Sequence, residues 1–88
     1  MPPFTIRIKK SVEKDLKQVP RDLIPSVLTT IECLESDPFP RNSGKIRGAE
    51  HFYRVRVGEY RIVYQVLVEE KVVTIFYIRH RSVAYRPF

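Results

Sequence analysis

The chain has 88 residues and a formal net charge of +6, from 16 Lys and Arg residues against 10 Asp and Glu. This length suits one small domain with a modest core and marginal stability, which a bound partner can raise. The longest polar connector, residues 36–50, is too short to divide the chain, so we expect residues 1–88 to form a single domain. The positive charge is typical of proteins that bind nucleic acid, an acidic protein or both.

Composition also excludes several classes of protein. The single cysteine, Cys33, cannot form an internal disulfide and matches no metal-binding spacing, which indicates a reducing compartment. Arg7 and Lys9 precede any long apolar run, and no run reaches membrane-spanning length, so we expect neither a signal peptide nor a membrane span. The sequence therefore predicts a soluble cytoplasmic protein, with no metal and no cofactor.

The N-terminal part predicts a short strand followed by a helix. Residues 4–8 alternate apolar and polar side chains, a period of two that is typical of a strand. Ser11 is a candidate N-cap for a helix whose apolar residues recur at helical spacing as far as Val19, where Pro20 interrupts the pattern.

A second helix is predicted after this break. Its apolar stripe, which stops near Asp37, consists of Ile24, Val27, Leu28, Ile31 and Leu34. Pro25 fits this helix only within the first turn, where its missing N–H group breaks no hydrogen bond. The two helices are expected to form a helical hairpin.

After the connector the apolar period changes to two, which predicts a three-stranded antiparallel meander over residues 52–57, 60–68 and 72–79. One face is apolar enough to carry the two helices: Tyr53, Val55, Val57, Tyr60, Ile62, Tyr64, Val66 and Val68. The other face gathers the charges toward one end: Phe52, Arg54, Arg56, Arg61, Val63, Gln65 and Leu67. We therefore expect an α+β fold.

The first two of these strands are joined by Gly58 and Glu59, which predict a two-residue turn with Gly58 supplying the positive φ of a type II′ turn. Arg56 then lies directly opposite Arg61, and Arg54 lies two residues along on the same face. Like charges directly opposite each other destabilise a sheet. The concentrated positive charge is therefore expected to serve a polyanion.

The pairing of the third strand stays open, because its turn can contain two or three residues. One choice places His80 opposite Arg61, and the other places Arg79 there. Either choice keeps the basic segment 79–81 beside the basic end of the hairpin.

Two stretches of the chain combine these residues into a longer pattern. They are Tyr53-Arg54-Val55-Arg56-Val57-Gly58-Glu59-Tyr60-Arg61-Ile62-Val63-Tyr64-Gln65-Val66, preceded by Lys45-Ile46-Arg47-Gly48, and Ile78-Arg79-His80-Arg81-Ser82-Val83-Ala84-Tyr85. They resemble the RelE/ParE superfamily of toxin–antitoxin toxins, on its RelE side. The resemblance covers nearly the whole chain, and its core, Y-R-x-R-x-G-x-Y-R-x-x-Y, is specific to the superfamily but not to one activity. It implies the RelE/ParE-like microbial RNase fold, an N-terminal strand and a helical hairpin packed on an antiparallel β-sheet.

The resemblance further implies a ribosome-dependent mRNA endonuclease that enters the A site, cuts the codon there and inhibits translation. A ribose 2′-OH would attack the neighbouring phosphate, leaving a cyclic phosphate and a free 5′-OH, with no metal needed if the site supplies charge stabilisation and proton transfer. The implied partners are a cognate antitoxin, mRNA and the 16S rRNA of the ribosome. The toxin–antitoxin complex would bind operator DNA through the antitoxin.

The resemblance also assigns roles to residues of this chain. Arg54 and Arg56 occupy the positions of the family's two hairpin lysines, and Arg61 matches the arginine that holds the scissile phosphate. Arg81, or Arg79 if the gap is placed differently, matches the arginine near the leaving group. Tyr85 matches the C-terminal tyrosine that stacks on a base. The residues expected to contact RNA are Lys45, Arg47, Arg54, Arg56, Arg79 and Arg86.

The two arginines at the lysine positions depart from the best-known member of the family. A guanidinium is a good phosphate clamp but a poor general base, because its pKa exceeds about 12. His80 is the first candidate for a general acid or base, because its unperturbed pKa lies near neutrality. Glu50, His51 and Glu59 are weaker candidates.

Other readings of the same residues stay open. Alone, the arginine cluster fits a solvated basic face or a docking surface for an acidic protein about as well as a nuclease site. Within the superfamily, the alternatives are a ParE-type toxin that inhibits DNA gyrase through protein contact, and a catalytically inactive relative. The combination of Arg61, His80, Arg81 and Tyr85 favours the nuclease, because a docking inhibitor has no evident need of it.

Overall fold

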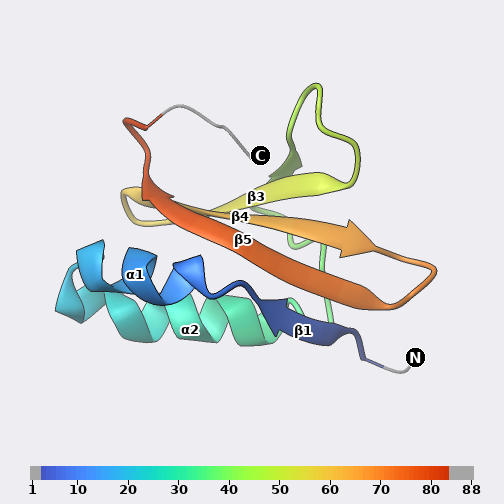
Figure 1. Cartoon of the computed structure of the whole chain (residues 1–88), viewed down its shortest axis with the longest axis horizontal. Coiled ribbons are helices and arrows are strands. Elements are labelled where there is room, and N and C mark those ends of the chain that lie inside the picture. The colour runs from blue at the N-terminus through green and yellow to red at the C-terminus, as the bar shows by residue number, and fades with distance from the viewer. Residues whose placement is uncertain (1–2, 84–88) are drawn as a thin grey trace.

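The structure is a computed structural model that describes residues 3–83. The described residues form a mixed five-stranded sheet in the order β1-β5-β4-β3-β2, with two helices packed on one of its faces (Figure 1). The elements are β1 (Thr5–Ile8), α1 (Ser11–Gln18), a 3-10 helix η1 (Arg21–Leu23), α2 (Ile24–Cys33), β2 (Ser43–Lys45), β3 (Phe52–Val57), β4 (Tyr60–Leu67) and β5 (Val72–His80). Neither described helix is long and apolar enough to cross a membrane.

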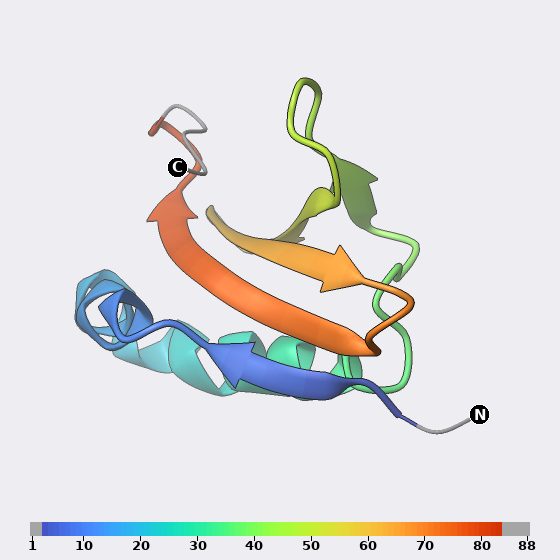
Figure 2. The ribbon, with the colours of Figure 1, turned by 45° about the vertical axis from the view of Figure 1, so that its right-hand side comes forward.

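The α+β fold predicted from the sequence is confirmed, with the first strand, both helices and the three-stranded meander at their expected places. Two edge strands complete the sheet. β1 pairs in parallel with β5, with Thr5 opposite Val72, and β2 pairs antiparallel with β3. Figure 2 shows these strands at the two edges of the curved sheet. β2 lies within the segment predicted to be a polar connector, so the sequence missed it.

The expectation that Ser11 caps the first helix is wrong. α1 begins at Ser11, Lys10 holds the N-cap position, and no side chain caps the helix. A side-chain cap is unnecessary because the N–H groups of Val12 and Glu13 donate to the carbonyls of Lys9 and Lys10.

The second helix begins with Pro25 in its first turn, as predicted. Val27, Ile31 and Leu34 are buried, whereas Leu28 is 44% exposed. The predicted stripe was therefore too wide. A helix that packs on a sheet along one line buries its central residues and leaves the flanking position to solvent.

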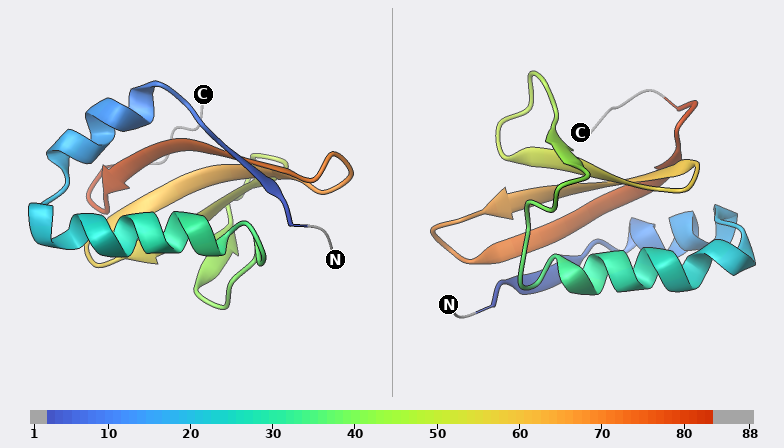
Figure 3. Two further views of the ribbon diagram at one scale, coloured as in Figure 1. Left: turned by 90° about the horizontal axis from the view of Figure 1, so that it is seen from below. Right: turned by 180° about the vertical axis from the view of Figure 1, so that it is seen from behind.

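The main core lies between the helices and the sheet. Figure 3 shows from two further sides how the two helices lie along one face of the sheet. Seven of the eight residues predicted for the helix-covered face belong to it: Tyr53, Val55, Val57, Tyr60, Ile62, Tyr64 and Val66. Val68 is the exception, at 53% exposed, because β4 ends at Leu67 and Val68 lies in the following turn.

A second, smaller apolar cluster lies on the opposite face of the sheet. It consists of Ile46, Ala49, Phe52, Val63 and Tyr77, with Phe76 packed against it. The loop between β2 and β3 covers this part of the sheet and buries Phe52 and Val63. The sequence placed both residues on the charged face without predicting that the loop would cover them.

A β-bulge in β5 decides which residues meet the arginines. Val63 is opposite Tyr77, but Tyr64 is opposite Ile75, so Phe76 is one extra residue on β5. One extra residue moves every following side chain to the other face. Arg79 therefore comes opposite Arg61, which resolves the choice that the sequence left open.

Tyr64 couples the sheet to the connector and gives the fold a pH dependence. Its fully buried hydroxyl donates a hydrogen bond to the Pro38 carbonyl at 2.8 Å, and burial raises the pKa of Tyr64 from 10.0 to about 12. Above pH 10 the unfolded chain loses a proton that the folded chain keeps. The free energy of unfolding is therefore expected to fall by about 2–3 kcal/mol between about pH 10 and pH 12.

Urea unfolding at stepped pH measures this decline, with Tyr64→Phe as the comparison. The variant should be less stable near neutral pH, because the Pro38 carbonyl loses its buried partner. It should also lack most of the alkaline decline. Equal declines in both proteins would contradict the assignment to Tyr64.

Candidate nucleic-acid interface

Three arginines lie side by side across neighbouring strands of the sheet. Arg56 on β3 is directly opposite Arg61 on β4, as predicted, and Arg61 is opposite Arg79 on β5. Directly opposite residues share a face, and here it is the face away from the helices, because the positions next to them along the strands are buried in the main core. We call Arg56, Arg61 and Arg79 the arginine row. With strands about 4.8 Å apart, it concentrates three positive charges on one surface.

The turn that sets this register depends on Gly58. Gly58 has a φ of +57°, so the positive φ predicted for this position is confirmed. A Cβ added to Gly58 would also lie 3.2 Å from Leu23 Cδ1. The position therefore favours glycine for its backbone conformation, and any other residue would also have to displace the Leu23 side chain of η1 by a few tenths of an ångström.

A pocket of about 230 Å³ adjoins the arginine row. Its lining residues are Asn42, Ser43, Gly44, Arg54, Arg56 and Arg61. Arg54 Nη1 donates to the Lys45 carbonyl at 3.2 Å, and Asn42 Nδ2 donates to the Arg56 carbonyl at 3.3 Å. We call this site the arginine pocket. Three guanidinium groups around one small cavity suit an oxyanion such as phosphate.

Asn42 and Gly44 are residues of this site that the sequence reasoning missed. A three-residue strand has too few positions to show a period, so β2 gave no pattern. Gly44 lies directly opposite Arg54, and a Cβ added to Gly44 would lie 3.2 Å from Arg54 Nη1 and 3.3 Å from its Cζ. The missing side chain leaves room for the Arg54 guanidinium to lie against β2.

Gly44→Ala is therefore expected to displace the Arg54 guanidinium while preserving the fold, because the contacted atoms end a flexible side chain. We expect the affinity of the arginine pocket for an oxyanion such as phosphate to fall by about tenfold, the change that corresponds to a loss of about 1.4 kcal/mol of hydrogen bonding. The measurement is a double-mutant cycle with Arg54→Ala. If Gly44→Ala has the same effect with and without the Arg54 side chain, Gly44 does not act through Arg54.

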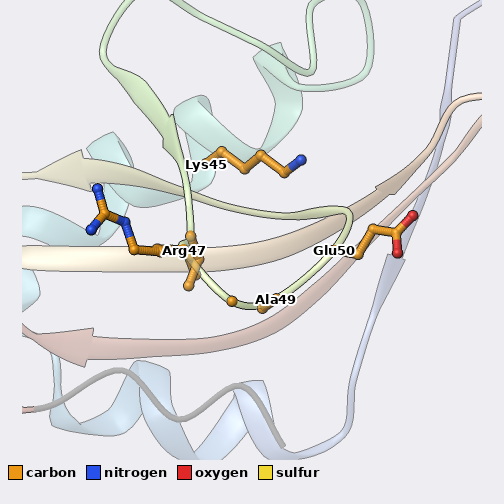
Figure 4. Close-up of a pocket in the computed structure, with 6 residues that line it drawn as sticks. Lys45, Arg47, Ala49 and Glu50 are labelled. Atoms are coloured by element: carbon orange, nitrogen blue, oxygen red, sulfur yellow. The ribbon is translucent and has the colours of Figure 1, made fainter.

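Of the predicted RNA-contacting residues, Lys45 is the last residue of β2 and Arg47 lies in the loop between β2 and β3. They line a broad, open hollow of about 590 Å³ with Ile46, Gly48, Ala49 and Glu50. Figure 4 shows the Lys45 and Arg47 side chains pointing in opposite directions from this segment. The two charges therefore flank the loop and do not converge on one atom. Glu50 Oε1 lies 3.3 Å from His51 Nε2, so these two weaker acid–base candidates contact each other.

Arg81 reaches the hairpin turn from the segment that follows β5. Its backbone N–H donates to the Glu59 carbonyl at 2.8 Å, and its Nε lies 2.5 Å from Glu59 Oε2. Arg61 Nη1 donates to the Arg81 carbonyl at 3.0 Å. Arg79 instead lies in the row, with its guanidinium carbon 4.4 Å from the Tyr77 ring centroid. Both candidates for the leaving-group arginine are thus close to Arg61, through different contacts.

His80 lies on the other side of the sheet from the arginine row. It is opposite Tyr60, and the two rings meet edge to face with centroids 5.3 Å apart. His80 Nδ1 accepts a hydrogen bond from the Ser82 backbone N–H at 3.2 Å and lies 2.8 Å from Ser82 Oγ. An Nδ1 that accepts from an N–H group carries no proton, so the neutral ring holds its proton on Nε2. The structure therefore does not bring this acid–base candidate to Arg61.

Asp15 is a further residue that supports the interface. Its Oδ2 accepts the backbone N–H of Ile78 at 2.9 Å, which ties α1 to β5 immediately before Arg79. Asp15 could have been recognised from the sequence, because it is an acidic residue three positions after Val12 and so lies on the apolar stripe of the first helix. Tyr85 and Arg86, both predicted to contact RNA, lie outside the described residues.

The chain is similar to known toxins over almost its whole length. The family model described as the ParE toxin of the type II toxin–antitoxin system, parDE, matches residues 6–85. A protein of Methanocaldococcus jannaschii that carries the toxin name RelE1 is 34% identical over 86 residues, which are 94% of this chain and 96% of that protein.

Two solved complexes contain similar folds. The toxin in the crystal structure of the archaeal RelE–RelB complex from Pyrococcus horikoshii OT3 matches with 31% identity and a TM-score of 0.80, covering 96% of this chain and 100% of that chain. The RelB–RelE antitoxin–toxin complex from Methanococcus jannaschii matches with 29% identity and a TM-score of 0.74, covering 86% and 91%.

The α+β fold, the arginine row on the face away from the two helices and the family match define a small basic toxin of a toxin–antitoxin system. The chain belongs to the RelE/ParE family of toxins of type II toxin–antitoxin systems. The resemblance found in the sequence is thus confirmed, and the chain is RelE-like within the family.

Proposed function

We propose that this toxin is a ribosome-dependent mRNA endonuclease that cuts the codon in the ribosomal A site and so inhibits translation. The observation that carries the proposal is the arginine row, beside the arginine pocket, on the face of the sheet opposite the two described helices. Row and pocket offer several guanidinium groups to the phosphates of a single RNA strand.

The proposed chemistry is attack of a ribose 2′-OH on the adjacent phosphate, which forms a cyclic phosphate and releases a 5′-OH. Arg61 holds the scissile phosphate from the middle of the row, and Arg54 and Arg56 clamp it from the pocket side. Arg81 stabilises the charge on the leaving oxygen. Fixed guanidinium groups stabilise developing negative charge without reorganising during the reaction.

Further contacts would hold the RNA strand in place. Lys45, Arg47, Arg79 and Arg86 would neutralise backbone phosphates, and Tyr85 would stack on a base. We assign proton transfer neither to His80 nor to an arginine of the row. His80 lies across the sheet from Arg61, and a guanidinium is a poor proton acceptor.

The proposed partners are mRNA, the ribosomal A site with its 16S rRNA, and a cognate antitoxin in the cytoplasm. Two similar solved toxins are in complexes with RelB antitoxins. An acidic, partly disordered antitoxin segment that folds on binding would neutralise the basic face. The resulting complex would bind operator DNA through the antitoxin.

The alternative is inhibition of DNA gyrase by protein contact. It is supported by the matching family model, which is that of a ParE toxin. A toxin of this kind would use the basic face for docking and would cleave no RNA. It would also tolerate the loss of individual arginines better than an enzyme does.

The test is to add the purified toxin to ribosomes stalled on a defined message and to map new 5′ ends. The proposal expects cuts at the A-site codon that carry a free 5′-OH and require ribosomes. Intact messages, together with inhibited gyrase in a supercoiling assay, would overturn the proposal in favour of the alternative.

A further inference from the structure

One carboxylate lies among the arginines of the interface. Glu59, in the turn between β3 and β4, places Oε2 at 2.5 Å from Arg81 Nε and Oε1 at 4.0 Å from Arg56 Nη2. The two oxygens of one carboxylate therefore face two different guanidinium groups. The three side chains are 52–55% exposed, so solutes can reach them.

This arrangement matches the recognition of a phosphodiester. A phosphodiester also presents two oxygens that share one negative charge, and guanidinium groups bind such a pair with directed N–H donors. Glu59 thus occupies the position between Arg56 and Arg81 that a backbone phosphate would take.

The position of Arg81 does not depend on this ion pair alone. The Arg81 backbone N–H donates to the Glu59 carbonyl at 2.8 Å, and Arg61 Nη1 donates to the Arg81 carbonyl at 3.0 Å. These hydrogen bonds keep Arg81 beside the turn when the Glu59 side chain rotates into solvent. A half-exposed ion pair contributes little to stability, so the exchange of one anion for another leaves the fold intact.

We propose that Arg56 and Arg81, besides contacting the scissile phosphate, hold the adjacent backbone phosphate in a second subsite next to Arg61, and that Glu59 fills this subsite until that RNA phosphate displaces it. This inference rests on the proposed function, because it takes RNA as the ligand of the arginine row. The row continues from the subsite across the sheet to Arg79. Such a series of cations favours a polymer with regularly repeated anions.

The test removes the internal anion and measures RNA binding. Glu59→Gln preserves the shape of the side chain and deletes its charge. The probe is a short single-stranded RNA with 2′-O-methyl riboses, which lacks the attacking hydroxyl and stays uncut, titrated without ribosomes at about 0.1 M salt. We expect binding about fivefold tighter than that of the wild type, and a log–log salt dependence steeper by about 0.7.

Glu69→Gln is the matched control. It removes the same charge beyond the opposite end of β4, in the turn before β5. Because salt screens a charge this far from the arginine row, the affinity for RNA should change less than about twofold. Unchanged or weaker RNA binding by Glu59→Gln, or an equal gain in both variants, would overturn the inference. So would tighter binding to a polyglutamate peptide without tighter binding to RNA, because the subsite would then serve an acidic protein.

Arg61→Ala, titrated in the same way, separates this inference from the proposed function. If Arg61→Ala binds RNA as well as the wild type does, the proposed function fails. If Arg61→Ala weakens binding while Glu59→Gln brings no gain, only the second subsite fails.

Discussion

Arg61→Ala is expected to slow the proposed cleavage of ribosome-bound mRNA by about a hundredfold to a thousandfold, because the loss of one fixed donor to a developing anion typically has this effect. Arg61 lies in the middle of the arginine row and also lines the arginine pocket. Its loss also removes the hydrogen bond to the Arg81 carbonyl, which positions the segment after β5. Single-turnover cleavage of a stalled ribosomal complex measures the effect.

Arg21→Ala is the control, since it removes the same charge from an exposed position in η1. It should cleave nearly as fast as the wild type. Arg61→Lys keeps the charge but loses the planar donor fork, so it should recover only part of the activity. All Arg61 variants should still bind an antitoxin, because one arginine is a small part of such an interface. A fully active Arg61→Ala toxin would remove the proposed site.

Ile62→Ala is expected to reduce the free energy of unfolding by about 3–4 kcal/mol, the range for a large-to-small change in a packed core. Ile62 is fully buried in the main core, on the strand that also carries Arg61. In a domain of this size the loss corresponds to a melting temperature lower by about 15 °C or more. Calorimetry or urea unfolding measures it.

Leu28→Ala is the matched control for the core prediction. It makes a similar change of side chain on α2 at a residue that is 44% exposed, so it should cost less than about 1 kcal/mol. A bound antitoxin should raise the melting temperature of Ile62→Ala, because ligand that binds only the folded state shifts the equilibrium toward it. If Ile62→Ala and Leu28→Ala lower the free energy of unfolding by similar amounts, the burial of Ile62 does not determine how much this side chain stabilises the fold.

Much of the fold could be predicted because the local patterns agree with the final packing. The period of two placed the strands that carry Val55 and Ile62, and its apolar set belongs to the main core. The two-residue turn at Gly58 placed Arg56 opposite Arg61, because turn length fixes the register of a hairpin. Two of the three arginines in the row could therefore be paired from the amino-acid sequence alone.

The other parts of the site depend on features without a local signal. Phe76 enters β5 as an extra residue. Apolar residues lie on both faces of β5 around this point, so the side-chain pattern does not mark where the extra residue enters. This bulge brings Arg79 to Arg61 and carries His80 to the other face. β2 has only three residues, too few to show a period, so the sequence did not predict that Asn42 and Gly44 line the arginine pocket. Contacts between distant segments cannot be read from spacing along the chain.

The parallel pairing of β1 with β5 affects when the arginine row is completed during folding. Thr5 pairs with Val72, so the two partners come from nearly opposite ends of the described chain, and such non-local pairings slow folding. Arg79 reaches Arg61 only after β5 has docked beside β4. Partly folded molecules that contain the hairpin alone would hold two arginines of the row but not the third. Toxicity should therefore require docking of β5, and an antitoxin that recognises the hairpin could bind its partner before the row is complete.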